Sequence, residues 1–123
     1  METGIKKEKY FIVKETESAK DMGSGDLEVL ATPILVAYFE NVSKDLVTPY
    51  LTEGDTTVGI NININHLAPS KIGNQILIKA ELIEINKRIL TFKLEAFDKD
   101  ILIGEGTHKR CIVNINKFLG KLN

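Results

Sequence analysis

Three polar side chains stand among apolar residues at places where hydrolytic chemistry could use them. Thr32 precedes an apolar helix-like run, Glu40 lies further along that run, and His66 ends an alternating strand-like run. A hydroxyl, a carboxylate and an imidazole are costly to bury unless they are paired. They are also the groups that acyl-transfer enzymes use as nucleophile, base and acid. The sequence therefore favours an enzyme that acts on an acyl compound.

Each of these residues also has an ordinary structural interpretation. Thr32 can cap the helix through its hydroxyl, and Glu40 stands four residues before Lys44, the spacing of a surface ion pair. His66 can be a satisfied core histidine. On a straight helix Thr32 and Glu40 would lie about 12 Å apart. The residues alone leave both interpretations open.

The helix that would carry Thr32 and Glu40 is predicted to run from Pro33 to Thr48. Proline is favoured at the first helical position, Thr32 then occupies the N-cap, and Pro49 ends the helix. Apolar residues recur at helical spacing and predict one buried face. That face consists of Leu35, Phe39, Val42 and Leu46, with Val36 and Val47 on its flank.

Most of the other residues alternate between apolar and polar side chains, as antiparallel strands do. Strands are predicted over residues 9–16, 56–66, 76–82, 90–96 and 101–116. A phase slip at Leu82-Ile83 predicts a bulge. One long helix with about five antiparallel strands predicts an α+β domain whose sheet curls over the helix. We expect a single domain over residues 1–123, with residues 1–8 frayed.

Two strands bear on the candidate chemistry. In 56–66 four apolar residues are predicted to share the face toward the helix: Val58, Ile60, Ile62 and Ile64. His66 has the same parity, so its imidazole should also face the helix. In the last strand His108 and Arg110 share a face, and for both the ordinary interpretation is a solvated surface.

Composition excludes several classes of function. The chain has 123 residues, 43% of them hydrophobic, and a net charge of −1, which argues against a general nucleic-acid or anionic-membrane binder. The lone Cys111 excludes an internal disulfide and fits a reducing cytoplasm. No apolar run approaches the roughly 18 residues of a membrane span. We expect a cytoplasmic protein without a metal site.

With these residues in view, the chain resembles the fluoroacetyl-CoA thioesterase-like family of hot-dog-fold proteins. The resemblance covers roughly residues 9–118. It rests on the order of helix and strands and on several short matches: "ATP" at 31–33, Glu40, "TVG" at 57–59, His66 and "IGEGTHKR" at 103–110.

The resemblance implies a hot-dog homodimer, with further pairing into a tetramer left open, whose sheets join edge to edge and whose active sites lie at the subunit interface. It implies a catalytic set of Thr32, Glu40 and His66, and acyl-thioester contacts from Gly59, Arg110 and His66. It implies no cofactor beyond CoA as part of the substrate. An interface site would also explain why Gly59 and His66 face opposite ways on an ideal strand. The ordinary interpretation of Gly59 alone is a bulge or a tight packing contact.

One segment departs from the family pattern. Fluoroacetyl-specific members carry a phenylalanine-bearing lid before the central helix, whereas residues 21–26 here are small and polar apart from Met22. A broader or different acyl group is therefore expected. The hypothesis is hydrolysis of a small acyl-CoA, with Glu40 as nucleophile or general base. The alternatives are a non-catalytic acyl-CoA or small-ligand binder and a hydratase acting on enoyl thioesters.

Overall fold

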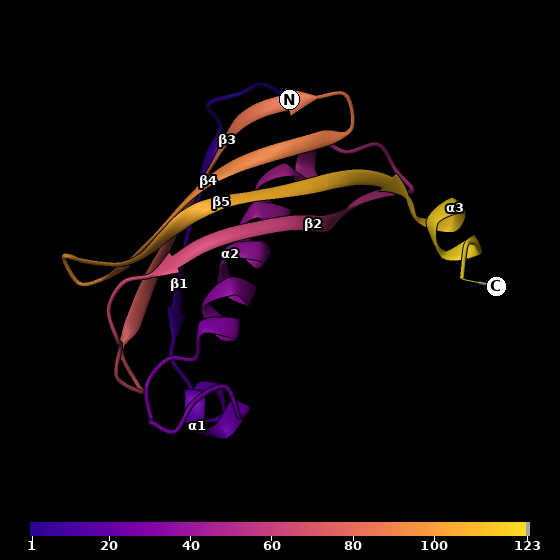
Figure 1. Cartoon of the computed structure of the whole chain (residues 1–123). Helices are drawn as coiled ribbons and strands as arrows, with labels where there is room; N and C mark the ends of the chain where they lie inside the picture. The colour runs from indigo at the N-terminus through magenta and orange to yellow at the C-terminus, as the bar shows by residue number, and fades with distance from the viewer. Residues whose placement is uncertain (123) are drawn as a thin grey trace.

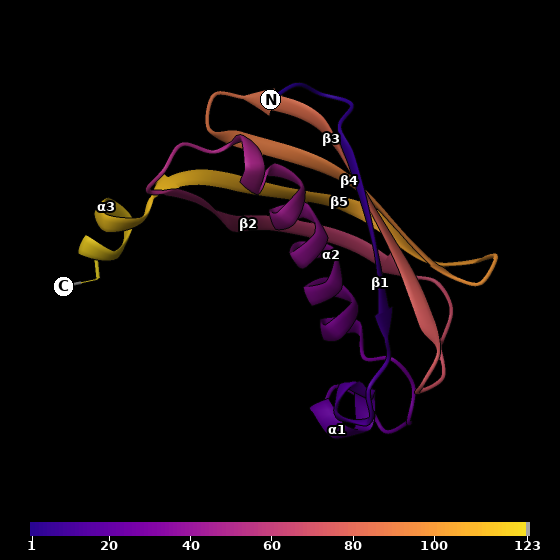
Figure 2. The ribbon, with the colours of Figure 1, turned by 180° about the vertical axis from the view of Figure 1, so that it is seen from behind.

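The computed structural model describes residues 1–122 and shows an antiparallel sheet that curves around a long helix (Figures 1 and 2). Its strands lie in the order β1-β3-β4-β5-β2, and every neighbouring pair is antiparallel. The strands are β1 (Lys6–Ile12), β2 (Asp55–His66), β3 (Gln75–Asn86), β4 (Ile89–Asp98) and β5 (Ile101–Asn114). The predicted α+β architecture is confirmed, and β1 and β2 form the two edges.

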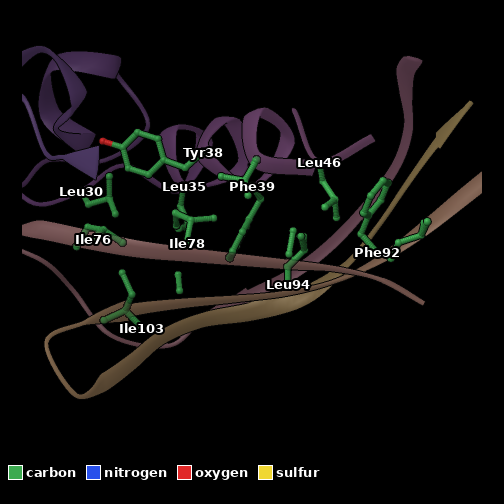
Figure 3. Close-up of a cluster of buried hydrophobic side chains, with 14 of the residues drawn as sticks. Leu30, Leu35, Tyr38, Phe39, Leu46, Ile76, Ile78, Phe92, Leu94 and Ile103 are labelled. Carbon is green, nitrogen blue, oxygen red and sulfur yellow. The ribbon is translucent and has the colours of Figure 1, made fainter. Parts of the chain in front are cut away.

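Helix α2 (Thr32–Val47) lies in the curve of the sheet, where its apolar face meets the side chains of the strands (Figure 3). The predicted stripe is confirmed, since all four of its members are buried: Leu35, Phe39, Val42 and Leu46. Burial of one such side chain contributes about 1.5–3 kcal/mol. The helix begins one residue earlier than predicted, at Thr32, and the chain then turns through η2 (Thr48–Tyr50).

The opposite wall of the core comes from the central strands. The alternating apolar residues of the predicted strands 76–82 and 90–96 are all buried there: Ile76, Ile78, Ala80 and Leu82 of β3, and Leu90, Phe92, Leu94 and Ala96 of β4. The register between these strands shifts between Leu82 and Glu84, which confirms the predicted bulge. The helix stripe and the two strands thus form one apolar core that fixes α2 against the sheet.

The first and last strands differ from their predicted bounds, and β1 runs over Lys6–Ile12 where a strand was predicted over residues 9–16. Lys6 already pairs with Glu81 of β3, and the Gly4 N–H donates to the Leu82 carbonyl at 2.8 Å. The expectation that residues 1–8 are frayed is therefore wrong for residues 6–8. The last strand ends at Asn114 and leads into helix α3 (Ile115–Gly120), where a strand was expected to reach residue 116.

Strand β2 contains a bulge beside Gly59, as one ordinary interpretation of that glycine allowed. Gly59 pairs with Arg110 of β5 and Asn61 pairs with Lys109, so Ile60 between them has no partner in the register. A bulge reverses the facing of every residue beyond it. The prediction that Val58 and the three isoleucines share one face is therefore wrong, and Ile60 is 51% exposed.

Two short helical segments precede α2, namely η1 (Glu15–Glu17) and α1 (Ala19–Met22). The first of them begins where the end of the strand 9–16 was predicted. They lie beside the start of α2 in both views of the ribbon (Figures 1 and 2). Among residues 1–122, the structure has no helix that is long and apolar enough to cross a membrane.

Candidate functional site

The structure brings two of the three predicted catalytic residues together. The Thr32 Oγ1 atom lies 2.7 Å from Nδ1 of His66, so the first residue of α2 contacts the last residue of β2. Thr32 does not cap the helix as predicted, because Ala31 occupies the N-cap position and Thr32 is already helical. The threonine hydroxyl is therefore committed to the imidazole instead of the helix backbone.

The imidazole of His66 has one nitrogen left for chemistry. Its Nε2 atom is buried and has no hydrogen-bond partner among the described residues. Burial lowers the pKa of His66, so the ring is neutral at neutral pH. A neutral imidazole anchored at Nδ1 and free at Nε2 can accept or return a proton.

An open pocket of about 300 Å³ adjoins this pair. It is lined by Thr32 and His66, by residues of the segment before α2, and by the turn after β2, namely Ala19, Ser24, Val29, Leu30, Leu67, Ala68 and Pro69. The lining is mostly small and apolar, which suits a short acyl chain. Ser24 comes from the small, polar stretch that departs from the family pattern.

Glu40 lies in a second group of residues on the same helix. Its carboxylate Oε2 is 4.0 Å from Nη1 of Arg110, and the glutamate side chain is 43% exposed whereas that of Arg110 is 8% exposed. The surface pair with Lys44 that the spacing suggested is not formed, because Lys44 contacts Asp45 at 3.2 Å. Glu40 thus faces a buried guanidinium.

The guanidinium of Arg110 is fixed by strand β2. Arg110 Nε donates to Thr57 Oγ1 at 2.8 Å, and Nη2 donates to the Thr57 carbonyl at 3.0 Å. The solvated interpretation of Arg110 is wrong, since the residue is 7% exposed. Burial lowers the pKa of Arg110 and the nearby Glu40 charge opposes that effect, so the side chain remains a cation.

Gly59 makes room for this arrangement. A Cβ atom on Gly59 would lie 2.9 Å from Glu40 Oε2 and 3.6 Å from Arg110 Nη1. The first distance is shorter than real Cβ contacts, so any larger residue would displace the carboxylate. The β2 bulge turns Gly59 to the α2 side, the side that His66 also faces. On an ideal strand these two residues would face opposite ways, so the bulge explains their shared side without a second chain.

The prediction that His108 is exposed to solvent is wrong. His108 was expected on a solvated face, yet it is 1% exposed and its ring adjoins Arg110. Thr57 entered the sequence analysis only as part of the "TVG" match at 57–59 and was given no role of its own. The shared parity of His108 and Arg110 was visible in the sequence, but their face was assigned to solvent because α2 was not known to cover it.

One chain therefore presents two separate groups of site residues. Thr32 and His66 meet at the start of α2, whereas Glu40, Gly59 and Arg110 meet two turns further along. The helical rise puts Thr32 and Glu40 about 12 Å apart. The structure does not bring all three predicted catalytic residues to one point within a single protomer.

Within residues 1–122, no three side chains of the His, Cys, Asp or Glu types lie close enough to hold a metal ion together. The chemistry available is that of a carboxylate, an imidazole, a hydroxyl and a guanidinium.

Known proteins resemble this chain in sequence and in fold. The profile of the fluoroacetyl-CoA-specific thioesterase family matches residues 13–116. The fluoroacetyl-CoA thioesterase of Streptantibioticus cattleyicolor is 33% identical over 95 residues, which are 77% of this chain and 68% of that protein.

Two solved structures show the same architecture. A mutant of the fluoroacetyl-CoA-specific thioesterase in complex with fluoroacetate and CoA superposes with a TM-score of 0.91 at 27% identity, covering 96% of this chain and 99% of that chain. A hot-dog-like protein from Thermanaerovibrio acidaminovorans superposes with a TM-score of 0.90 at 15% identity, covering 98% and 89%. The expected hot-dog fold is confirmed.

Proposed function

The chain belongs to the fluoroacetyl-CoA-specific thioesterase family, and from this membership we propose that it hydrolyses a small acyl-CoA thioester to the free acid and CoA. The observation that carries the proposal is the contact of Thr32 with His66 beside an open pocket. The pair supplies a hydroxyl and a neutral imidazole where an acyl group would fit.

The active site is assembled from two copies of the chain. Within one protomer Glu40 lies too far along α2 to act with Thr32 and His66. Strand β2 is an edge of the sheet with twelve residues and no partner on its outer side among residues 1–122, and such edges pair readily with another strand. A homodimer joined at β2 would set the Thr32–His66 pair of one copy against the Glu40 group of the other.

Hydrolysis in this assembly follows one of two routes. Glu40 either takes a proton from water while the water oxygen bonds to the carbonyl carbon, or attacks that carbon itself and forms an anhydride that water then cleaves. In the general-base route His66 carries the proton from Glu40 to the CoA sulfur as the C–S bond breaks. In the anhydride route CoA leaves as a thiolate when the C–S bond breaks, and His66 accepts a proton from the water that cleaves the anhydride and passes it to the sulfur. Thr32 and the free N–H groups at the start of α2 stabilise the oxyanion.

Gly59, Arg110 and His66 contact the acyl thioester. The buried guanidinium of Arg110 supplies a fixed positive charge near the carboxylate, and Gly59 leaves space between them. Such preorganised charge lowers the cost of a developing negative charge in the transition state.

The acyl group is broader than fluoroacetyl. Residues 21–26 are all exposed and small or polar apart from Met22, and Ser24 of this segment forms part of the pocket wall together with Ala19. No phenylalanine, tyrosine or tryptophan is among the residues that line the described pocket. Short unsubstituted acyl groups should therefore be accepted at rates similar to fluoroacetyl.

The test is release of free thiol from a panel of acyl-CoAs by the wild-type protein and by two variants. Glu40→Gln and His66→Ala should each reduce hydrolysis by about 10²-fold or more, the usual contribution of a positioned acid or base. Glu53→Gln, which changes an exposed glutamate in the turn before β2, should act at the wild-type rate. Wild-type rates in Glu40→Gln and His66→Ala would exclude this site, and acyl-CoA binding without thiol release would favour the non-catalytic binder.

A further inference from the structure

His108 lies beneath the Glu40 group with both ring nitrogens in contact with protein atoms. Nδ1 is 2.7 Å from the Asn61 carbonyl oxygen of β2, and Nε2 is 3.1 Å from Nη1 of Arg110. The ring is 1% exposed and packs near Phe92 of β4 at 6.1 Å between centroids.

These two contacts fix the protonation of the ring. A carbonyl oxygen only accepts, so Nδ1 must carry a hydrogen and donate to Asn61. A guanidinium only donates, so Nε2 must be unprotonated and accept from Arg110. Both hydrogen bonds exist only in the neutral Nδ1–H tautomer. A doubly protonated ring would place an N–H against the N–H of Arg110.

The two contacts have different consequences. The Asn61 carbonyl belongs to the residue that follows the β2 bulge, so the Nδ1 bond supports the strand. The Nε2 bond instead acts on Nη1 of Arg110, the same nitrogen that faces Glu40 at 4.0 Å. A Cβ on Gly59 would lie 3.3 Å from Cε1 of His108, which places the ring directly against this group.

We propose that His108 is a positioning residue that holds the Arg110 guanidinium beside Glu40 through its unprotonated Nε2. The fixed guanidinium in turn keeps the Glu40 carboxylate in the position that the hydrolytic step requires. The inference rests on the proposed function for its kinetic consequence and on geometry for the hydrogen bonds. Thr57 fixes two nitrogens of Arg110, and His108 fixes the third, so the guanidinium cannot rotate away from Glu40.

The charged groups that face the ring are one cation and one anion. Arg110 on the same strand disfavours protonation of His108, and Glu40 on α2 favours it. Burial has the largest effect and lowers the pKa of His108. The neutral ring is therefore the resting form at neutral pH, as the tautomer assignment requires.

Two substitutions separate the role of Nε2 from the role of Nδ1. The amide of Gln reaches the position of Nε2, so His108→Gln keeps an acceptor for Arg110 and loses the donor to Asn61. The shorter amide of Asn reaches the position of Nδ1, so His108→Asn keeps the donor and loses the acceptor. We expect kcat/KM to fall about ten-fold or more in His108→Asn, as for a lost hydrogen bond to a charged group, and to stay within about three-fold in His108→Gln.

The opposite order of the two variants, or an equal loss in both, would overturn the proposal, because His108 would then serve the β2 bulge or the core alone. A thermal unfolding curve of each variant shows whether it folds.

The chain has two histidines, so an NMR spectrum of protein labelled with ¹⁵N-histidine contains the signals of two imidazoles, and the spectrum of His66→Ala shows which signals belong to His108.

That spectrum tests the hydrogen bonds without any assay of hydrolysis. His108 should show a protonated Nδ1 and an unprotonated Nε2 in the wild-type protein, and its pKa should rise in Arg110→Met, which removes the neighbouring positive charge. A His108 ring protonated at Nε2, or a His108 pKa that is unchanged in Arg110→Met, would refute the proposed contact whether or not the protein hydrolyses an acyl-CoA. The expected spectrum together with a lack of hydrolysis would contradict the proposed function and leave the contact established.

Discussion

The hydroxyl of Thr32 lies 2.7 Å from Nδ1 of His66, which joins the first residue of helix α2 to the last residue of strand β2. These residues are 34 positions apart in the sequence. Their contact depends on two features of the fold. The helix begins at Thr32 with Ala31 as its N-cap, and the β2 bulge turns His66 and Gly59 to the same side of the sheet.

Removal of the threonine hydroxyl should disable the imidazole without unfolding the protein. In Thr32→Val the side chain keeps its shape and loses the hydrogen bond to His66, so kcat should fall about 10- to 100-fold. Thr32 is exposed at the start of the helix, so the free energy of unfolding should change by less than about 1 kcal/mol. Thiol release and urea unfolding measure the two effects.

The matched control for that change is Thr32→Ser, which keeps a hydroxyl at the same position. It should retain most of the activity. If Thr32→Val hydrolyses acyl-CoA as fast as Thr32→Ser, the contact with His66 has no part in the reaction.

A single methyl group at Gly59 should displace the carboxylate of Glu40. The added Cβ would lie 2.9 Å from Oε2, so the glutamate must move away from Arg110. We expect Gly59→Ala to lower kcat/KM about ten-fold or more, since a small displacement of a catalytic group has a large effect on rate. Steady-state kinetics measure the loss.

Gly120→Ala provides the control for Gly59→Ala, because no other atom lies within 4 Å of a Cβ at that position and Gly120 is not among the glycines with a positive φ. It should leave the kinetics unchanged. Full activity in Gly59→Ala would mean that the position of the Glu40 carboxylate beside Gly59 is not the reactive one.

Stability should fall as the solution becomes acidic, because burial lowers the pKa of both His66 and His108. A histidine with a lowered pKa in the folded state binds fewer protons than it does in the unfolded chain. Its contribution to stability is complete above the unfolded pKa of about 6.5 and is lost as the pH falls through the folded pKa. Urea unfolding between pH 8 and pH 5 measures the effect.

The same titration of His108→Asn separates one histidine from other acid-sensitive groups. The dependence of the unfolding free energy on pH in this window should be shallower in the variant, because one of the two titrating rings is gone. Identical slopes in the two proteins would show that His108 has the same pKa folded and unfolded.

The sequence predicted the framework of the site well, because that framework follows from local patterns. The apolar spacing of α2, the alternation of β3 and β4 and the slip at Leu82 each reflect the period of one element. The contact of Thr32 with His66 was not predicted from the residues themselves. The family resemblance implied only that both belong to one catalytic set with Glu40.

What the sequence did not predict depends on contacts between elements. The run 56–66 alternates almost perfectly, and the glycine at position 59 allowed a bulge or a tight packing contact without deciding between them. Only the register against β5 places the bulge at Ile60. His108 and Arg110 were assigned to a solvated face. That face is covered by α2 and Thr57, and because both are distant in sequence from the last strand, the local pattern did not reveal the cover. The hydroxyl of Thr32 had two competing partners, and only the tertiary structure decides between the helix backbone and His66.

The most direct test of the composite site is a mixed dimer of two inactive chains. One chain carries Glu40→Gln and the other carries His66→Ala, and two different affinity tags allow the mixed species to be purified after co-expression. If Glu40 of one copy acts with His66 of the other, each mixed dimer contains one intact site and one doubly altered site. Its thiol release should then reach about half of the wild-type rate per dimer, since the two sites of a symmetric dimer are equivalent. A mixed dimer as inactive as its two parents would contradict the account.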